Sequence, residues 1–201
     1  MKTGNRSRRT TLLGLLTAIL MVFGMTPLGY LNVGPLAISF NMIPVAIGAA
    51  ALGPVGGAIL GAVFGMTSFL QCLGIGGSSA MGVILFDINP IFAFIQRFVP
   101  RVTAGFLVGV IYQAARRFCK PGLAGSIAGF CAALLNTVLF MGALVLLFGN
   151  TQYLTDLIAG RNVIVFICTF VGVNAVAEML ATTAVTGALT AALERSGLLR
   201  R

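Results

Sequence analysis

A few polar side chains interrupt long apolar runs, and their spacing places them on shared helix faces. Asn174 and Glu178 are four residues apart, and so are Arg97 and Arg101. Residues four apart lie one turn apart on the same face of an α-helix. Because polar groups inside apolar segments are costly, they are candidates for ligand contacts by default. We therefore expect a recognition site that uses guanidinium, carboxylate and amide groups.

Each charged candidate also has a purely structural interpretation. Arg97 and Arg101 reach the outer headgroup region if their side chains snorkel, whereas at the mouth of a pocket they would attract a carboxylate or a phosphate. Glu178 lies deepest in an apolar run among the carboxylates, and a hydrogen bond or ion pair with another helix explains it equally well. Three neutral side chains complete the candidate set: Asn41, Gln71 and Asn136.

The composition places these candidates inside a membrane protein. Hydrophobic residues make up 58% of the 201 residues and charged residues 8%, whereas a soluble domain has roughly 25% charged residues. The mean hydropathy is +1.04. The apolar runs reach the length of about 20 residues that a membrane-crossing helix needs. We therefore predict an all-α integral membrane bundle that forms a single domain over residues 1–201.

Six apolar segments are predicted to cross the membrane, and turn chemistry separates them. The Gly53-Pro54 pair is typical of a tight turn, and a basic stretch from Arg116 to Lys120 separates two later segments. The predicted helices run from about Thr10 to Met25, Ile38 to Leu52, Val55 to Leu73, Ile91 to Ala115, Gly122 to Phe148 and Asn162 to Leu193. Polar loops are expected to begin near Thr26, Gly74 and Gly149.

The net charge of +9 is distributed in a way that predicts orientation rather than nucleic-acid binding. Basic residues precede the first helix, separate the fourth from the fifth, and end the chain. Cytoplasmic flanks of membrane helices carry an excess of Lys and Arg. The basic segment 1–9, the 116–120 loop and the C-terminus are therefore predicted to be cytoplasmic. We interpret the first apolar stretch as a retained helix rather than a cleaved signal peptide.

Signatures of catalysis and of metal binding are not found in the sequence. There is no histidine, which is the commonest general base and metal ligand. Neither of the two lysines, Lys2 and Lys120, belongs to a phosphate-binding G-x-x-x-x-G-K loop, and the four cysteines show no paired spacing. We therefore predict no catalytic residue, no metal and no cofactor, and we expect the chain to borrow energy from a partner.

Small residues recur at four-residue spacing in several predicted helices. Glycines occupy every fourth position from Gly53 to Gly65, and such stripes let helix backbones approach closely within a membrane. In the first helix, Gly14 and Ala18 have the same spacing. These two residues either pack inside the bundle or dock against a partner membrane protein.

Several sequence blocks resemble the substrate-binding membrane subunit, or S component, of energy-coupling factor (ECF) transporters. The most specific block reads IPVAIGAAALGP, from Ile43 to Pro54. The similar residues, which cover nearly the whole chain, are Pro27–Tyr30, Phe40–Ala49, Leu52–Gly61, Phe64–Ser68, Val99–Arg101, Gly105, Asn136–Phe140, Asn174 and Glu178.

The resemblance implies a six-helix subunit of the bacterial cytoplasmic membrane that binds a vitamin or related micronutrient from outside. It implies as partners a transmembrane coupling protein, docked through Gly14 and Ala18, and two cytoplasmic ATPases. The pantothenate-type branch is the most similar, and riboflavin, another vitamin or a vitamin precursor are the alternatives. The substrate-binding candidates are then Asn41, Gln71, Arg97, Arg101, Asn136, Asn174 and Glu178.

Two further functions compete with this interpretation. A stand-alone secondary transporter or channel would use Glu178 as a proton or ion site and would need no ATPase. An intramembrane enzyme without histidine would need an unusual Ser/Lys or carboxylate mechanism, and Lys120 lies in a predicted cytoplasmic loop, poorly placed for one. We therefore expect a binding subunit rather than an enzyme.

Overall fold

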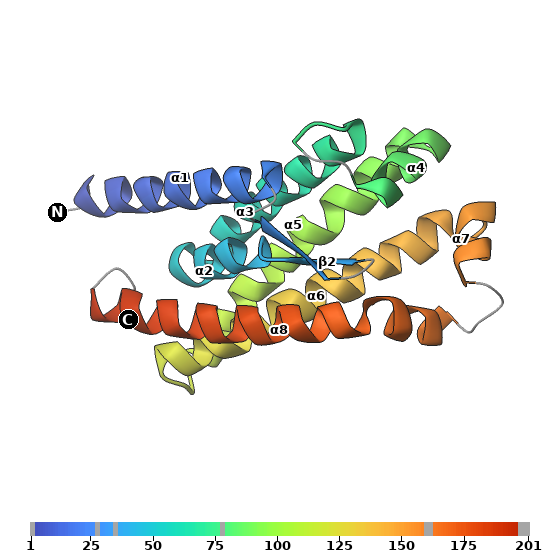
Figure 1. Cartoon of the computed structure of the whole chain (residues 1–201). Helices are drawn as coiled ribbons and strands as arrows, with labels where there is room; N and C mark the ends of the chain where they lie inside the picture. The colour runs from blue at the N-terminus through green and yellow to red at the C-terminus, as the bar shows by residue number, and fades with distance from the viewer. Residues whose placement is uncertain (1–2, 27–28, 34–35, 77–78, 159–162, 197–201) are drawn as a thin grey trace.

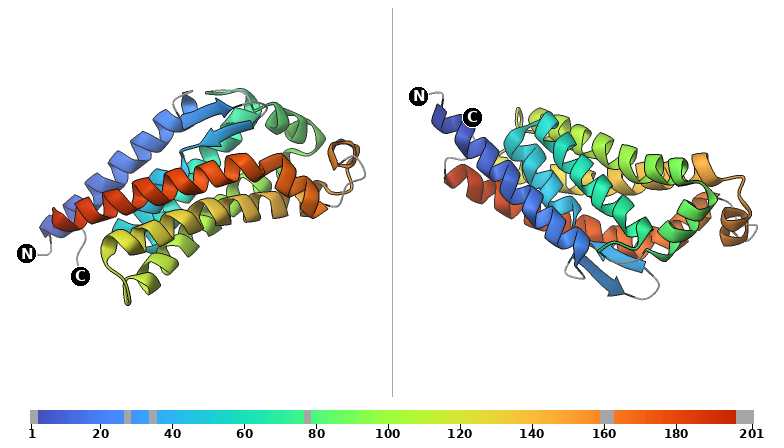
Figure 2. Two further views of the ribbon diagram at one scale, coloured as in Figure 1. Left: turned by 60° about the horizontal axis from the view of Figure 1, so that its bottom comes forward. Right: turned by 90° about the horizontal axis from the view of Figure 1, so that it is seen from above.

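The computed structural model describes residues 3–26, 29–33, 36–76, 79–158 and 163–196, and helices form most of this range (Figure 1). Within it, the side chains that lie outside the description are those of residues 3–6, 30–33, 36–38, 157–158, 163–171, 173 and 174. Neighbouring long helices lie side by side along one common direction (Figure 2). This arrangement is a helical bundle.

The elements comprise long helices, short helices and one hairpin. The long helices are α1 (Thr3–Met25), α3 (Pro54–Leu70), α5 (Pro90–Ala115), α6 (Pro121–Phe148) and α8 (Val163–Arg195). The shorter ones are α2 (Met42–Leu52), α4 (Ala80–Ile88), α7 (Gln152–Ile158) and a 3-10 turn η2 (Gln71–Leu73). Strands β1 (Tyr30–Val33) and β2 (Leu36–Ser39) pair antiparallel, with Tyr30 opposite Ser39.

Five helices in the described part of the chain are long and apolar enough to cross a membrane. The apolar α2 has 11 residues, which at 1.5 Å per residue span about 16 Å. That length is shorter than the hydrocarbon core of about 30 Å. The prediction of a multi-pass helical membrane protein is therefore confirmed. The structure has five long spans in its described part instead of the predicted six, because α2 is too short to count as one.

The segment before α2 differs from the prediction. We expected a loop up to about Ala37 and a helix from Ile38, but residues 36–39 form β2 and α2 begins at Met42. A short apolar run does not distinguish a strand from a helix by periodicity alone. Among the described residues, the regular elements are therefore helices and a hairpin, whose second strand lies beside α8 (Figure 2).

Two predicted polar loops contain short helices. The Ser79 side chain caps α4 by accepting a hydrogen bond from the backbone N–H of Gly82 at 3.2 Å. Asn89 ends α4 in an extended conformation, as residues before a proline tend to do, and its side chain caps α5. The second short helix is α7, in the segment that follows α6. In the sequence, Ser79 is a signal for the start of α4 and Pro90 is a signal for its end and for the start of α5.

The glycine stripe of α3 packs against the backbone of α5. A Cβ atom on Gly57 would overlap the carbonyl oxygen of Gly105, and one on Gly61 would overlap the carbonyl oxygen of Arg101. The predicted close helix contact is thereby confirmed. Because no side chain lies between the two backbones, α3 fixes the position of α5 at Arg101.

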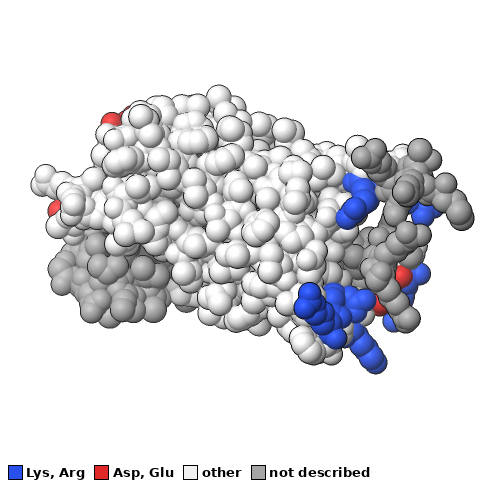
Figure 3. Space-filling view, turned by 180° about the vertical axis from the view of Figure 1, so that it is seen from behind, with Lys and Arg blue, Asp and Glu red and all other residues white. Residues whose placement is uncertain are grey.

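The two ends of the bundle differ in charge. The described N- and C-terminal segments and the α5–α6 loop lie together at one end, and α4 and α7 lie at the other (Figure 1). Lys and Arg side chains gather at the end that holds the termini (Figure 3). We call this the basic end; its described basic residues are Arg8, Arg9, Arg116, Arg117, Lys120 and Arg195.

Candidate functional site

Arg97 and Arg101 of α5 point into the bundle rather than toward its surface. Each is only 6% exposed. The Arg97 guanidinium donates to the hydroxyl oxygens of Ser68 and Ser79, both at 3.1 Å. The Arg101 guanidinium donates to the carbonyl oxygen of Arg97 at 2.6 Å. Neither side chain therefore snorkels to the headgroup region.

Aromatic rings flank both guanidinium groups. The Cζ atom of Arg97 is 5.4 Å from the ring centroid of Phe140, and that of Arg101 is 4.8 Å from the same centroid. Arg101 also lies 4.6 Å from the ring centroid of Phe64. Cation–π contacts of this length favour a desolvated cation. Asn136 precedes Phe140 by one turn of α6 and so shares its face.

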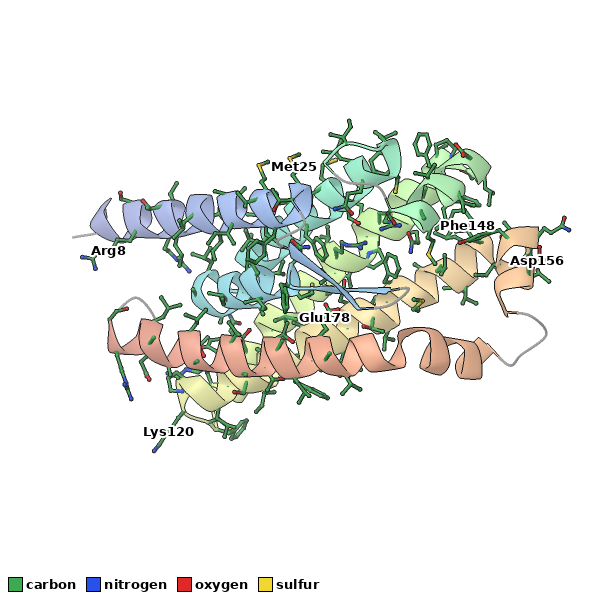
Figure 4. All side chains as sticks on the ribbon, viewed as in Figure 1. Arg8, Met25, Lys120, Phe148, Asp156 and Glu178 are labelled. Carbon is green, nitrogen blue, oxygen red and sulfur yellow. The ribbon has the colours of Figure 1, made fainter. Side chains whose placement is uncertain are left out.

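Glu178 of α8 is buried within electrostatic range of Arg101. It is 8% exposed, it accepts a hydrogen bond from the backbone of Ser39, and it interacts electrostatically with Arg101. Asn41 is fully buried, and its amide nitrogen donates to the Ser39 hydroxyl at 3.2 Å. The end of β2 therefore connects Asn41 to Glu178, which lies midway along the bundle (Figure 4).

We call this group the arginine centre; its members are Ser39, Asn41, Phe64, Ser68, Arg97, Arg101, Asn136, Phe140 and Glu178. All four acidic residues of the sequence lie in the described part of the chain. Asp87 and Asp156 are exposed, and Glu194 pairs with Arg116 at the basic end. Glu178 is thus the buried carboxylate. Two guanidinium groups and one carboxylate leave an excess of positive charge, which suits an anionic ligand.

The remaining predicted residues occupy different positions. The Oδ1 atom of Asn136 is buried and has no hydrogen-bond partner among the described residues. Gln71 is buried in η2, and its amide donates to the carbonyl oxygen of Gly24 at 2.6 Å, which connects η2 to α1. Asn174 belongs to α8 one turn before Glu178, but its side chain lies outside the described residues.

Sequence reasoning missed four members of the arginine centre, Ser39, Phe64, Ser68 and Phe140, and also the nearby Gln96. Phe64 and Phe140 are two of 15 phenylalanines, and no spacing singles them out. Gln96 did carry a signal, since it is a polar residue beside Arg97 within an apolar helix. The structure buries it completely.

Pro100 shapes α5 between the two arginines. Proline has no backbone N–H, so the helical hydrogen bond to the carbonyl oxygen of Gln96 is missing. The Arg101 side chain takes the next carbonyl, that of Arg97. The backbone hydrogen bonding of α5 is therefore altered at Pro100, between the two arginines.

The basic end has a different character. A surface hollow of about 500 Å³ is lined by residues 116–121 and Glu194. Phe118 is 89% exposed there, and a guanidinium nitrogen of Arg116 lies 3.5 Å from a Glu194 carboxylate oxygen. Across the described residues, no three His, Cys, Asp or Glu side chains are grouped to hold a metal ion.

Comparisons with known proteins show the family to which the chain belongs. A family model described as "ECF transporter, substrate-specific component" matches residues 8–190. The chain is also 26% identical over 207 residues to the pantothenic acid transporter PanT of Lactococcus lactis subsp. cremoris (strain MG1363), covering 96% of this chain and 98% of the relative. The family match extends over nearly all of the transmembrane bundle, including both arginines and Glu178. This chain therefore belongs to the family of substrate-specific components of ECF transporters.

Proposed function

We propose that this chain is the specificity subunit of an ECF-type vitamin importer and that its ligand is pantothenate. The subunit would take the vitamin from outside the bacterial cytoplasmic membrane and deliver it inward with a coupling protein and two ATPases. Family membership supports the transporter role, and the name of the lactococcal relative supports the vitamin.

The observation that carries the proposal is the buried pair Arg97 and Arg101 beside a single carboxylate. Pantothenate has one carboxylate, one amide and two hydroxyl groups. A carboxylate accepts charge-assisted hydrogen bonds from guanidinium groups, which are among the strongest hydrogen bonds in proteins. The two arginines would therefore bind the acid end of the ligand.

Neutral groups around the arginines would bind the rest of the ligand. The unpartnered oxygens of Asn41, Asn136 and Glu178 among the described residues are acceptors available to hydroxyl and amide hydrogens. A buried acceptor without a partner is costly, so a ligand that supplies the missing donors would be favoured. Gln71 and Asn174 complete the proposed set, Gln71 at the contact between η2 and α1.

We also propose six membrane crossings with both termini in the cytoplasm, counting the short α2 as a crossing. The gathering of Lys and Arg at the end that holds both termini supports this orientation (Figure 3). An even number of crossings is required when both termini lie on one side. Labelling of single engineered cysteines at residues 4 and 150 from either side of intact cells would test it.

Docking to the coupling protein is proposed to use Gly14 and Ala18. Both are exposed on α1, and a Cβ on Gly14 would meet nothing within 4 Å. On the opposite face, Leu16 and Leu20 are buried in the core. Gly14→Leu or Ala18→Leu should therefore reduce co-purification with the coupling protein while the isolated subunit still binds its ligand. Joint loss of docking and ligand binding would instead indicate a folding defect.

Native mass spectrometry of the detergent-purified chain, followed by calorimetric titration with pantothenate, tests the substrate. A bound mass equal to pantothenate, or saturable binding, supports the proposal. A different bound vitamin, such as riboflavin, would retain the subunit role and replace the substrate. An empty protein that binds no member of a vitamin panel contradicts both.

A second candidate function is a stand-alone transporter or channel that uses Glu178. The observation that favours it is the buried Oε1 atom of Glu178, which lacks a hydrogen-bond partner in the described part of the chain. In this case proteoliposomes holding only this chain would accumulate substrate, and an ionophore would abolish the uptake. Accumulation that requires ATP and the ATPase partners would exclude it.

A further inference from the structure

Gln96 has a buried amide that makes no hydrogen bond with the residues that the structure describes. Its side chain is 0% exposed. Both its Oε1 and its Nε2 atoms are without a hydrogen-bond partner among the described residues. A buried amide normally finds partners, because leaving its donor and acceptor unpaired is costly. Such an exception requires an explanation in function.

The neighbours of Gln96 place it at the contact between α5 and α6. Ala93, one turn before it, packs in an apolar cluster with Met141 and Leu144 of α6. Arg97, the next residue, lies over the ring of Phe140, also on α6. Gln96 therefore lies along α5 between two residues that pack against α6, and it precedes Arg97 in the chain.

The chemistry of a carboxamide defines what it would recognise. Its oxygen accepts and its nitrogen donates, so it complements a group that can do both, and a hydroxyl is the simplest such group. A buried carboxamide on the same helix as the two guanidinium groups thus suits a ligand that carries a hydroxyl group as well as an anion, as pantothenate does with its hydroxyl groups at the opposite end from its carboxylate. The backbone carbonyl oxygen of Gln96 is a further acceptor on the same turn of α5, because Pro100 has no N–H to donate to it.

We infer that Gln96 is a specificity-determining residue that binds a hydroxyl group of the ligand whose acid end Arg97 and Arg101 bind. This inference rests on the proposed function, since it assigns the hydroxyl part of the same ligand. It also implies that the unpaired amide lowers the stability of the ligand-free protein. The amide is retained because ligand recognition needs it.

The test compares two ligands and three proteins by calorimetric titration. The ligands are pantothenate and N-(3,3-dimethylbutanoyl)-β-alanine, which is the same skeleton without its two hydroxyl groups. The proteins are the wild type, Gln96→Met, which removes the amide at similar side-chain length, and Gln113→Met. Gln113 is the matched control because it is an exposed glutamine on the same helix.

We expect Gln96→Met to weaken pantothenate binding about 10- to 100-fold, the equivalent of losing hydrogen bonds to a buried polar group. Binding of the deoxygenated analogue should change less than about threefold, and Gln113→Met should change neither affinity. The thermal unfolding temperature of the ligand-free Gln96→Met protein should equal or exceed that of the wild type, because an unpaired buried amide has been removed.

An equal loss of affinity for both ligands would overturn the inference, because Gln96 would then act on the acid or amide part or through Arg97. Unchanged affinity for pantothenate would also overturn it. A lower unfolding temperature of the ligand-free variant would assign Gln96 to structure instead. Wild-type protein that binds neither ligand would contradict the proposed function itself, a result distinct from these three.

Discussion

Two regions of this molecule concentrate positive charge, and their surroundings differ. At the basic end, Lys and Arg side chains gather on the surface (Figure 3), and Arg117 and Lys120 are exposed. In the arginine centre, Arg97 and Arg101 are 6% exposed and contact aromatic rings and hydroxyl groups. Exposed charges are screened by water and salt, whereas a desolvated charge keeps its field. Under the proposed function, burial rather than the number of charges would separate a recognition site from an orientation signal.

The electrostatic interaction between Arg101 and Glu178 gives the largest expected effect. Arg101→Met removes a buried guanidinium that interacts electrostatically with Glu178, donates to the Arg97 carbonyl oxygen and lies over two aromatic rings, and loss of such a buried charged partner costs about 3 kcal/mol of unfolding free energy. SDS-induced unfolding of the ligand-free protein measures this loss. Arg117→Met, at the exposed end, should leave the same curve unchanged.

A double substitution sharpens this result. Glu178→Gln combined with Arg101→Met removes both charges, so it should recover part of the stability lost in Arg101→Met alone. Strictly additive losses in the two single variants and the double variant would show that the two side chains are energetically independent.

Ligand affinity is the second way to separate the two regions. Arg97→Met keeps an unbranched side chain but removes the guanidinium that would bind the acid group, so pantothenate should bind about 100-fold more weakly. Calorimetric titration against Arg117→Met provides the comparison at equal charge change. Equal affinities in the two variants would show that charge at Arg97 is used for structure alone.

Glycine packing tests whether helix contacts position the arginine centre more tightly than the basic end. A Cβ on Gly61 would overlap the backbone carbonyl of Arg101, whereas one on Gly122 would meet the Ala191 Cβ at 3.3 Å and nothing closer. Gly61→Ala should therefore lower the unfolding free energy by about 2 kcal/mol, as overpacking does. Gly122→Ala should cost far less, and similar losses in both variants would contradict the difference in packing.

Much of this architecture could be predicted from the sequence because the patterns that specify it extend over many residues. Apolar runs, Gly-Pro turns and flanking basic residues act over whole helices, so the helices predicted from Ile91 and from Gly122 agree with α5 and α6 to within one residue at each end. The hairpin and α4 could not be predicted in this way. Short apolar segments of four to nine residues fit a strand, a helix or a loop, and tertiary contacts decide among them.

The arginine centre, as the candidate site, was predictable only in part, because spacing within one helix carries no information about the other helices. Helical spacing correctly placed Arg97 and Arg101 on one face, but spacing within one helix does not say what faces it from another. The Phe140 ring, the Ser39 backbone and the burial of Gln96 depend on how α5, α6, α8 and the hairpin come together. Gln71 was predicted to bind substrate because it is a polar residue in an apolar segment. In the structure its amide donates to the backbone carbonyl oxygen of Gly24 and so connects η2 to α1.

The smallest expected effect on binding belongs to the basic end. Arg117→Gln with Lys120→Gln removes two exposed charges, and because these are far from the arginine centre and solvated, pantothenate affinity should change less than about twofold. The same variant should lose preference for anionic lipid, since each basic residue near a charged leaflet contributes about 1 kcal/mol. Native mass spectrometry from nanodiscs of mixed phosphatidylglycerol and phosphatidylcholine measures that preference. A large fall in ligand affinity would mean that the exposed charges act on the site at long range, and the separation between recognition and orientation would fail.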